Sequence, residues 1–414
     1  MKPYPEYKDS GVEWIGKIPE HWRIDRLKWA CNFIYGNSLA SLDREEGVVP
    51  VYGSNGVTGY HDKAITEAPC IIIGRKGSYG KVNISMKPCF PIDTTYFVDK
   101  RYTSNEILWL KYILPTLGLD SFSKDTGVPG LSREEAYSKP VITPPLSEQK
   151  QIAKYLDHKT AQIDSLIEKK KRLIELFREE RTAVINQAVT KGLDPNVPMK
   201  DSGIEWLGEI PAHWEVKRLK YESKTNREAL PETTRPDYEF EYIDIGNVSL
   251  SKINDTPKLF SFGNAPSRAR RVVKKGDTIL STVRTYLKAI TYIDMENENL
   301  IASTGFAVIT PGINLNPKYL SYLMISEKII DTICSLSTGV SYPAVNSSDV
   351  ENIPIWYPNL TEQNLIVGYI EKETTRIDTI ISKSEKEITL LQEYRTALIS
   401  EVVTGKIDVR EERI

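Results

Sequence analysis

The chain has 414 residues, enough for two domains with their own cores and the segments between them. Its 54 lysine and arginine residues nearly balance 56 acidic residues, which excludes a global positive field, so nucleic-acid binding would depend on local clusters. The four cysteines show neither a C-x-x-C pair nor a histidine at ligand spacing, which argues against a zinc site or a disulfide framework. With no apolar signal region and no run of 18 apolar residues, we expect a cytoplasmic protein without a membrane segment.

The first feature in chain order is a segment that occurs twice. Residues 9–22 read DSGVEWIGKIPEHW, residues 201–214 read DSGIEWLGEIPAHW, and both continue into Arg-Leu-Lys. We call each copy a lead segment. An alternative interpretation makes His21 and His213 catalytic or ligating, but each copy has one histidine without a nearby partner. We instead expect the tryptophans to anchor the lead segments, with their indole N–H groups bonded.

Residues 1–146, which include the first lead segment, are predicted to form one domain. Short β-branched and aromatic runs alternate there with Gly, Pro, Asn and Asp, which predicts strands and turns. The expected strands are 48–52, 70–73, 82–86 and 95–98, with a helix near 105–114. Asn55-Gly56 favours a hairpin, whose neighbouring tyrosines serve either recognition or packing.

Within this domain, residues 71–81 (IIIGRKGSYGK) predict a strand that runs into a glycine-rich basic loop. Glycine lets the backbone approach a ligand closely, while Arg and Lys supply donors for phosphate or for the guanine edge. The G-x-x-G-x-x-G spacing matches neither common nucleotide-binding motif. A tight hairpin with solvated lysines is the alternative. The candidate DNA contacts in this loop are Arg75, Lys76, Ser78, Tyr79 and Lys81.

A second loop, residues 125–132 (DTGVPGLS), precedes the strand that leads out of the domain. Thr126 is a candidate contact to phosphate or base. The alternative is that Gly127 only ends a helix.

Residues 147–192 predict a long helix. Apolar residues recur at steps of 3, 4 or 7, which places them on one face and favours a coiled-coil seam. Ser147 suits the N-cap, Pro144-Pro145 stops an upstream helix, and Gly192 fits a C-terminal cap. A helix of this length spans roughly 65 Å.

Residues 193–360 repeat the plan with a second lead segment and domain. The expected strands are 240–245, 271–273, 278–283, 289–293 and 306–309, with a helix near 317–334. A strand again delivers arginine to a Tyr/Lys loop, although the glycines are not kept. The basic run 268–275 is a plausible phosphate clamp, with an exposed sheet edge as the alternative. The candidate DNA contacts here are Arg268, Arg270, Arg271, Arg284, Tyr286, Lys288, Ser341 and Tyr342.

Residues 361–414 form the distal long helix and C-terminal tail. An offset of 214 positions aligns its apolar face with that of the first long helix and also aligns identities off that face. We therefore expect the two helices to specify each other, because polar layers fix register. The alternative is a helical pair that only joins the domains.

Sets of catalytic residues with known spacing are missing from the sequence: it has no Walker A stretch, no H-E-x-x-H and no nucleophile elbow. Residues 316–319 (NPKY) differ from the Asn-Pro-Pro-Tyr of amino-methyltransferases and are explained better as a helix start. We expect no intrinsic enzymatic activity.

The duplicated lead segment, the Leu-Ser-Glu-Gln and Leu-Thr-Glu-Gln starts at 146–149 and 360–363, and Arg-Thr-Ala at 181–183 and 395–397 resemble the specificity subunit of type I restriction-modification systems. The resemblance implies an α+β fold, a tandem duplication of a mixed α/β target-recognition domain followed by a long helix, with the long helices packed as an antiparallel coiled coil. Each domain would read one half of a split sequence in double-stranded DNA.

The resemblance also implies partners. Two methyltransferase subunits and restriction (motor-nuclease) subunits would dock on the helices, and S-adenosylmethionine, ATP and Mg would belong to those partners, leaving no cofactor in this subunit. The residues expected to bind partners are Trp14, Trp22, Tyr155, Arg181, Trp206, Trp214, Tyr369 and Arg395. Two other classes remain open at this point: a coiled-coil adaptor for proteins, and a lone nuclease or methyltransferase.

Overall fold

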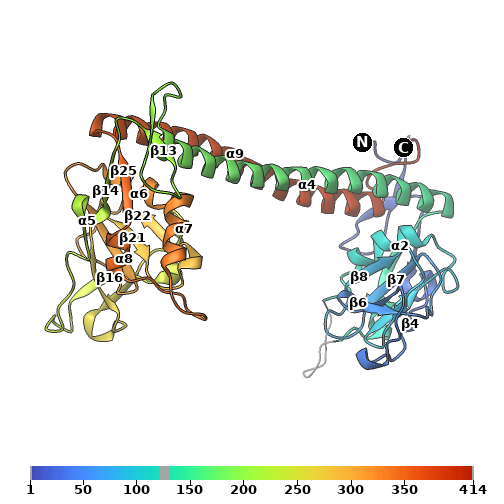
Figure 1. Cartoon of the computed structure of the whole chain (residues 1–414). Coiled ribbons are helices and arrows are strands. Elements are labelled where there is room, and N and C mark those ends of the chain that lie inside the picture. Colours follow the sequence, from blue (N-terminus) through green and yellow to red (C-terminus); the bar gives the residue numbers. More distant parts are fainter. Residues whose placement is uncertain (1, 122–129, 413–414) are drawn as a thin grey trace. The chain divides into compact units, whose positions relative to one another are not determined.

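The structure is a computed structural model that describes residues 2–121 and 130–412. The chain divides into two compact units: unit 1 comprises Met1–Lys171 and Glu385–Ile414, and unit 2 comprises Arg172–Ser384. Each unit contains one globular domain, domain 1 or domain 2, together with parts of both long helices (Figure 1). These helices are α4 (Leu146–Lys191) and α9 (Leu360–Val403).

The lead segments form the same small framework in both units. In unit 1, β1 (Tyr7–Asp9) pairs with β2 (Lys17–Pro19), and β3 (Arg23–Arg26) pairs with β11 (Pro140–Thr143). In unit 2 the corresponding pairs are β12 (Met199–Asp201) with β13 (Glu209–Pro211) and β14 (Glu215–Arg218) with β25 (Pro354–Tyr357). All four pairs are antiparallel. Because β11 and β25 lead directly into α4 and α9, each lead segment closes its domain at the start of a long helix.

Domain 1 contains a four-stranded sheet in the order β4 (Ile34–Tyr35), β10 (Thr95–Val98), β7 (Cys70–Gly74), β8 (Val82–Ser85). A three-stranded sheet has the order β6 (Gly56–His61), β5 (Val49–Gly53), β9 (Phe90–Pro91). Its helices are α1 (Leu27–Ala30), α2 (Ile107–Ile113) and α3 (Arg133–Ser138), with the 3-10 turns η1 (Ser41–Asp43) and η2 (Leu114–Leu117). Every residue of β7 is buried, so this central strand holds the start of the loop that follows it in a fixed position.

Domain 2 repeats the four-stranded sheet in the order β15 (Ser223–Thr225), β24 (Phe306–Pro311), β21 (Thr278–Ser281), β22 (Ile290–Tyr292). It adds a second four-stranded sheet in the order β19 (Lys258–Ser261), β16 (Glu239–Ile243), β23 (Leu300–Ser303), β20 (Ala269–Val273), and a hairpin of β17 (Val248–Ser249) and β18 (Lys252–Ile253). Its helices are α5 (Leu219–Glu222), α6 (Pro317–Met324), α7 (Glu327–Leu336) and α8 (Ser347–Glu351), with 3-10 turns η3 (Ile245–Asn247), η4 (Phe262–Asn264) and η5 (Thr285–Leu287).

The expected α+β duplication is confirmed, with local differences. The single helix predicted near 317–334 is two helices, because the chain turns at Ile325 and Ser326 and the Ser326 hydroxyl bonds to the Leu323 carbonyl at 2.6 Å. The predicted hairpin exists, but its turn residues are Ser54 and Asn55, and Gly56 begins β6 with φ +125°.

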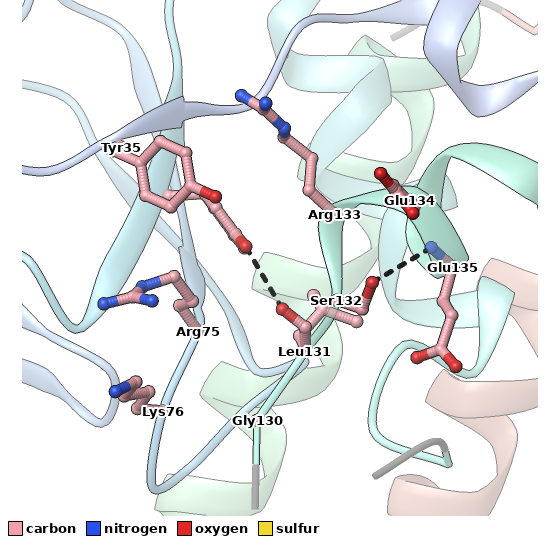
Figure 2. A pocket seen from close by; sticks show the side chains of 10 residues that line it. Tyr35, Arg75, Lys76, Gly130, Leu131, Ser132, Arg133, Glu134 and Glu135 are labelled. Carbon is pink, nitrogen blue, oxygen red and sulfur yellow. Dashed lines mark hydrogen bonds between the residues drawn. The ribbon is translucent and has the colours of Figure 1, made fainter. Parts of the chain in front are cut away.

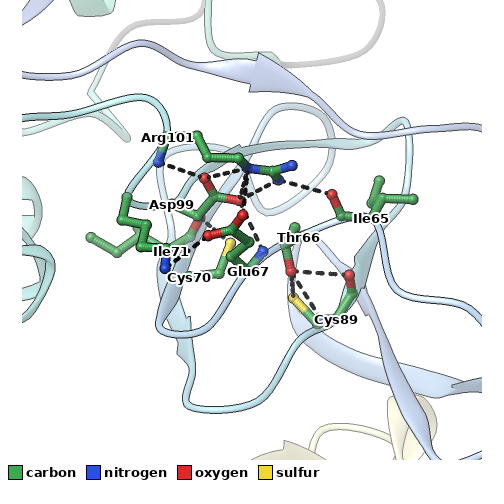
Figure 3. A network of polar contacts seen from close by, with 9 residues as sticks. Ile65, Thr66, Glu67, Cys70, Ile71, Cys89, Asp99 and Arg101 are labelled. Atoms are coloured by element: carbon green, nitrogen blue, oxygen red, sulfur yellow. Dashed lines mark hydrogen bonds and ion pairs between the residues drawn. The ribbon is translucent and has the colours of Figure 1, made fainter.

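A buried polar network holds the far end of the central sheet of domain 1 (Figure 3). The Asp99 side chain is fully buried and accepts hydrogen bonds from the Arg101 guanidinium and from the Glu67 backbone N–H at 3.0 Å. Cys70 and Cys89 lie next to it as free, buried thiols. Hydrogen bonding to Cys89 and burial raise the pKa of the Cys70 thiol, so it stays neutral.

The long helices pack against each other within each unit. In unit 1, Ile163 and Ile167 of α4 share a core with Leu398 and Val402 of α9 and with domain 1. In unit 2, Ile185 and Val189 of α4 share a core with α9 residues Ile366 and Ile370 and with domain 2. In each unit the chain directions of the paired segments are opposite. Each length of the helical pair is therefore part of the core of the domain beside it.

One ion pair between the helices occurs in both units. In unit 2, Arg181 Nε lies 3.2 Å from Asp378 Oδ1, and in unit 1, Arg395 Nε lies 3.0 Å from Asp164 Oδ1. Adding 214 to the residue number takes Asp164 to Asp378 and Arg181 to Arg395. The two ion pairs are therefore equivalent contacts of the duplicated unit. Such exposed pairs contribute little stability, about 0–1 kcal/mol, but they favour one register. Since both arginines have partners inside the chain, their predicted docking role remains a prediction.

The Glu of each Ser/Thr-Glu-Gln start holds the lead segment. Glu148 accepts a hydrogen bond from Trp22 Nε1 at 2.9 Å and from the Tyr4 hydroxyl at 3.2 Å, and its Oε1 lies 2.6 Å from His21 Nε2. Glu362 repeats the first contact with Trp214 Nε1 at 3.1 Å and lies 2.7 Å from His213 Nε2. The bonded indoles of Trp22 and Trp214 agree with the expected anchoring role, and each histidine adds a second contact to the same carboxylate.

The neighbouring Gln holds the globular domain. Gln149 Oε1 accepts from the Glu106 backbone N–H at 2.8 Å, where Glu106 is the N-cap of α2. Gln363 Oε1 accepts from the Asn316 backbone N–H at 2.7 Å, where Asn316 is the N-cap of α6. The repeated Glu-Gln pair thus fastens a lead segment and a domain helix to the first turn of each long helix.

Three residues expected to bind partners are buried, and that part of the prediction is wrong. Trp22 and Trp214 have no exposed surface because their rings lie inside the two cores. Tyr155 is 3% exposed, whereas Tyr369, which occupies the equivalent position 214 residues later, is 42% exposed. Tyr155 shares a buried cluster with Val409 of the C-terminal tail, and Gln151 Nε2 on the preceding turn of α4 donates to the Val409 carbonyl at 3.2 Å. Among the described residues, no helix has the length and apolar character that a membrane crossing requires.

Replacing Glu148 by Ala should lower the free energy of unfolding by about 1–3 kcal/mol, because it leaves the buried Trp22 N–H and Tyr4 hydroxyl without an acceptor. Chemical denaturation of the whole chain measures the change. Glu411→Ala removes only an exposed pair with Lys2 and should change stability by less than about 0.5 kcal/mol. Equal stability of Glu148→Ala and the parent chain would contradict the anchoring role.

Candidate nucleic-acid interface

The two loops that the sequence singled out in domain 1 are joined in the structure. The loop that follows β7 begins at Arg75, whose carbonyl accepts a hydrogen bond from the Leu131 backbone N–H at 2.8 Å. Lys76 and Gly130 form an isolated antiparallel bridge. The end of a buried strand therefore meets the end of the second loop, and both present their side chains at one surface.

An aromatic ring organises that surface. The Arg75 guanidinium lies 5.4 Å from the Tyr35 ring centroid, and the Arg133 guanidinium lies 5.1 Å from it (Figure 2). Arg75 is also held by two hydrogen bonds from Nε and Nη2 to the Asp93 carbonyl, at 2.9 and 2.7 Å. Both cations are thus placed by cation–π and polar contacts before any ligand binds.

The sequence did not identify Tyr35 and Arg133 as part of this surface. Tyr35 lies on β4, a two-residue strand that the pattern did not predict. The aromatic and β-branched run Phe33-Ile34-Tyr35 before Gly36 is the signal that could have indicated it. Arg133 is the first residue of α3, directly after the predicted loop. The surface encloses a cavity of about 470 Å³, which Ser132, Glu134 and Glu135 also line.

The other predicted contacts of domain 1 have different environments. Lys81 Nζ donates to Asn55 Oδ1 at 2.6 Å, which joins the loop to the turn of the β5–β6 hairpin. Ser78 is exposed, whereas Tyr79 is half-buried against the core and so also has a packing role. Thr126 lies outside the described residues.

Domain 2 joins its two loops in the same way. Val345 N–H donates to the Thr282 carbonyl at 2.8 Å, as Leu131 N–H does to the Arg75 carbonyl, and Val283 and Ala344 form an antiparallel bridge. Arg284 N–H also donates to the Pro343 carbonyl at 2.7 Å. The Arg284 guanidinium lies 4.8 Å from the ring centroid of Tyr342. An arginine beside a tyrosine, at the junction of the same two loops, is therefore common to both domains.

The backbone of the loop is kept although its glycines are not. Gly74 and Ser281 make equivalent hydrogen bonds, from their N–H groups to the carbonyls of Lys81 and Ala289 at 2.8 and 2.9 Å. Three positions after Gly74 and Ser281, Gly77 with φ +73° corresponds to Arg284 with φ +51°. One position before Lys81 and Ala289, Gly80 with φ +74° corresponds to Lys288 with φ +51°, so the loop of domain 2 is one residue longer. Left-handed conformations of residues other than glycine cost about 1 kcal/mol or more and concentrate at functional sites.

The remaining predicted contacts near this loop are open to solvent. Tyr286 and Tyr342 are more than half exposed, and Ser341 and Lys288 are exposed as well. Together with Arg284 they form a surface of two cations and two tyrosines. Such a surface can offer donors to phosphates or base edges and flat rings for stacking.

The basic run 268–275 is less free than its sequence indicates. Arg268 Nη2 lies 3.1 Å from Asp244 Oδ2, Lys274 pairs with Glu228 and Lys275 pairs with Glu296. The run contains β20, the last strand of its sheet, but residues 228–230 cover the outer side of this strand. Leu230 N–H donates to the Arg270 carbonyl at 2.8 Å and Val272 N–H donates to the Glu228 carbonyl at 3.2 Å, so the exposed sheet edge of the alternative interpretation is not found here.

Two further arginines of this run have apolar surroundings. Burial lowers the pKa of Arg271, whose Nε is buried without a hydrogen-bond partner. The Arg270 guanidinium stacks 4.4 Å from the Phe262 ring. The phosphate-clamp role of the run stays a prediction.

The fold and the two surfaces define a class: a chain of two tandem α+β domains, each with an arginine–tyrosine loop pair, built onto two long helices that pack together. The family described as type I restriction modification DNA specificity domain matches residues 19–176 and 211–390. The chain therefore belongs to this family.

Individual proteins agree. The type I restriction enzyme MjaVIII specificity subunit of Methanocaldococcus jannaschii is 24% identical over 95% of each chain, and the putative MjaX specificity subunit of the same organism is 25% identical over 96% of each chain. The HsdS subunit of Thermoanaerobacter tengcongensis has the same fold, with a TM-score of 0.57 and 15% identity over 94% of this chain and 98% of that one. A chain solved for complex assembly of the type I R-M system gives a TM-score of 0.65 at 14% identity, over 94% and 99% of the two chains.

Two substitutions at Arg284 separate its backbone from its side chain. Arg284→Gly and Arg284→Ala both remove the guanidinium and should weaken binding to target DNA equally, as measured by fluorescence anisotropy. Because only alanine keeps the left-handed strain, the glycine variant should unfold with a free energy about 1 kcal/mol higher than the alanine variant.

Lys288→Gly and Lys288→Ala form a matched pair at the same φ. Equal stabilities within each pair would show that the loop carries no strain. Unchanged DNA binding of both Arg284 variants would remove this residue from the interface.

Proposed function

We propose that this chain is the DNA sequence-specificity subunit of a type I restriction-modification complex and that its two domains read the two halves of a bipartite target. The observation that carries the proposal is the shared junction of two loops after a buried strand, with Arg75 beside Tyr35 in domain 1 and Arg284 beside Tyr342 in domain 2. Membership of the specificity family supports it. The junction has the same construction in both domains while its residues differ, as two readers of different sequences require.

Energetics explain why two readers are needed. A good bidentate base contact discriminates by about 1–3 kcal/mol, so one domain with a few contacts would select poorly. Two readers on one chain raise each other's effective concentration at the second half-site. The net charge of −2 fits this role, because the phosphate contacts can be shared with other subunits.

The proposal extends to partners. Two methyltransferase subunits would dock on this chain, restriction (motor-nuclease) subunits would join the complete assembly, and the complex would work on cytoplasmic DNA. S-adenosylmethionine, ATP and Mg would bind to those partners, and the specificity subunit would supply no catalytic group. The relatives named as specificity subunits of type I restriction enzymes support this division of labour.

Exchange of residues 30–140 for the corresponding domain of another specificity subunit should change one half of the methylated sequence and leave the other half intact. Sequencing that detects modified bases in the host genome gives the answer. A change in both halves would contradict the modular mechanism. A coiled-coil adaptor for proteins would show no specific duplex binding and no steep dependence of affinity on salt.

Arg75→Ala should weaken or relax recognition at a single half-site by about 1–3 kcal/mol, because the guanidinium is directed by Asp93 and Tyr35 toward one surface. Competition binding with oligonucleotides altered in one half-site measures this effect. Lys63→Ala, an exposed change next to Asp62 outside both loops, serves as the control. Equal losses on every sequence would identify Arg75 as a phosphate contact instead.

A further inference from the structure

A second surface, made by residues outside the predicted loops, is duplicated in the two domains. It begins where each lead segment ends, in the short helices α1 and α5. Trp29 is 71% exposed and Tyr221, at the equivalent position of the repeat, is 69% exposed. Large aromatic rings this exposed at matching positions are not explained by packing within either domain.

Each ring is accompanied by the same cations. Lys28 Nζ lies 4.7 Å from the Trp29 ring centroid, and Lys220 Nζ lies 5.4 Å from that of Tyr221. The arginine two positions before each lysine, Arg26 or Arg218, is also exposed. We call the two sets, Arg26–Lys28–Trp29 and Arg218–Lys220–Tyr221, the twin patches.

Hydrogen bonds fix the cations of the patch in unit 2. In unit 2, Asn352 Oδ1 accepts from Arg218 Nη1 at 3.1 Å and from Lys220 Nζ at 2.8 Å, while Asn352 Nδ2 bonds to the Ser348 carbonyl at 2.8 Å. In unit 1 the equivalent position is Ser138, which lines one shallow depression together with Lys28 and Trp29. Preorganised cations beside a flat ring lose little entropy when a ligand binds.

In domain 2 the patch lies apart from the loop junction, whereas in domain 1 α1 packs against α3, which begins at the junction residue Arg133. In domain 2, α5 packs against β14, β15 and α8, whereas η5 of the junction packs against α7. Figure 1 shows α5 and α7 on opposite sides of unit 2. A duplex read by the junction loop does not need the α5 surface for base contacts.

We propose that the twin patches dock two copies of one partner protein, each inserting an apolar residue against the ring and placing carboxylates opposite the cations. This inference rests on the proposed function, in which the partner is the methyltransferase subunit. Tryptophan, tyrosine and arginine dominate the energetics of protein interfaces, whereas contacts to DNA phosphates need donors but no exposed ring. Duplication of the surface within one chain matches a partner that is present twice.

The test uses the full chain co-purified with its methyltransferase partner and native mass spectrometry to count subunits. The parent chain should carry two copies. Trp29→Ala and Tyr221→Ala should each bind one copy about tenfold or more weakly and leave one in place, and the double variant should lose both. Tyr60→Ala, which removes a ring that is 59% exposed on β6, should keep two copies.

Three outcomes overturn the docking site. Two copies bound with parental affinity to the double variant would show that the patches carry no partner. Parental stoichiometry with weaker DNA binding and a smaller salt slope for the isolated double variant would make them phosphate contacts. If the parent chain bound no methyltransferase at all, the proposed function would fall with the site, and this result is distinct from the first two. Because both side chains are exposed, stability should stay within about 0.5 kcal/mol of the parent chain, which denaturation verifies.

Discussion

The structure depends on one carboxylate at the start of each long helix, buried at Glu148 and partly buried at Glu362. Glu148 and Glu362 accept the indole N–H of a fully buried tryptophan and lie against a histidine of the same lead segment. The glutamine that follows each of them bonds to the first turn of a domain helix. Because an unpaired polar group inside a core costs free energy, each contact favours the others, and together they hold the lead segment and the domain on the long helix of the same unit.

This common anchoring leaves the surface loops free to differ. The two domains share sheet order and the hydrogen bonds at the loop junction, while one uses glycines and the other uses Arg284 and Lys288 in the same left-handed conformations. The backbone geometry of the loop junction is therefore common to both domains, whereas the side chains attached to it differ. Arg284 and Lys288 keep a strained backbone conformation that glycine would relieve. We infer that these side chains contribute more to function than the strain costs in stability.

The basic residues also differ in whether they are paired within the chain. The chain is nearly neutral overall, and much of its basic run 268–275 is paired with acids or packed on a ring. Arg75 and Arg284 are instead positioned by aromatic rings, and Arg75 also by a backbone carbonyl. The twin patches also place cations beside an aromatic ring, but outside the loops. The duplicated framework therefore presents two kinds of surface: loop junctions that differ between the domains and twin patches that are similar in both.

The sequence by itself determined the duplication, the two long helices, the central strands of both domains and the basic loops after them, because periodicity and internal repeats are local signals. Only the tertiary structure showed that Tyr35 and Arg133 join Arg75, that the two loops of each domain meet, and that Trp22, Trp214 and Tyr155 are inside. Those facts depend on which distant segments pack together, and no spacing along the chain records burial. A buried anchor and an exposed contact can have the same residue type and the same position in the repeat. Which of the two a residue becomes depends on the segments that pack against it in the folded chain.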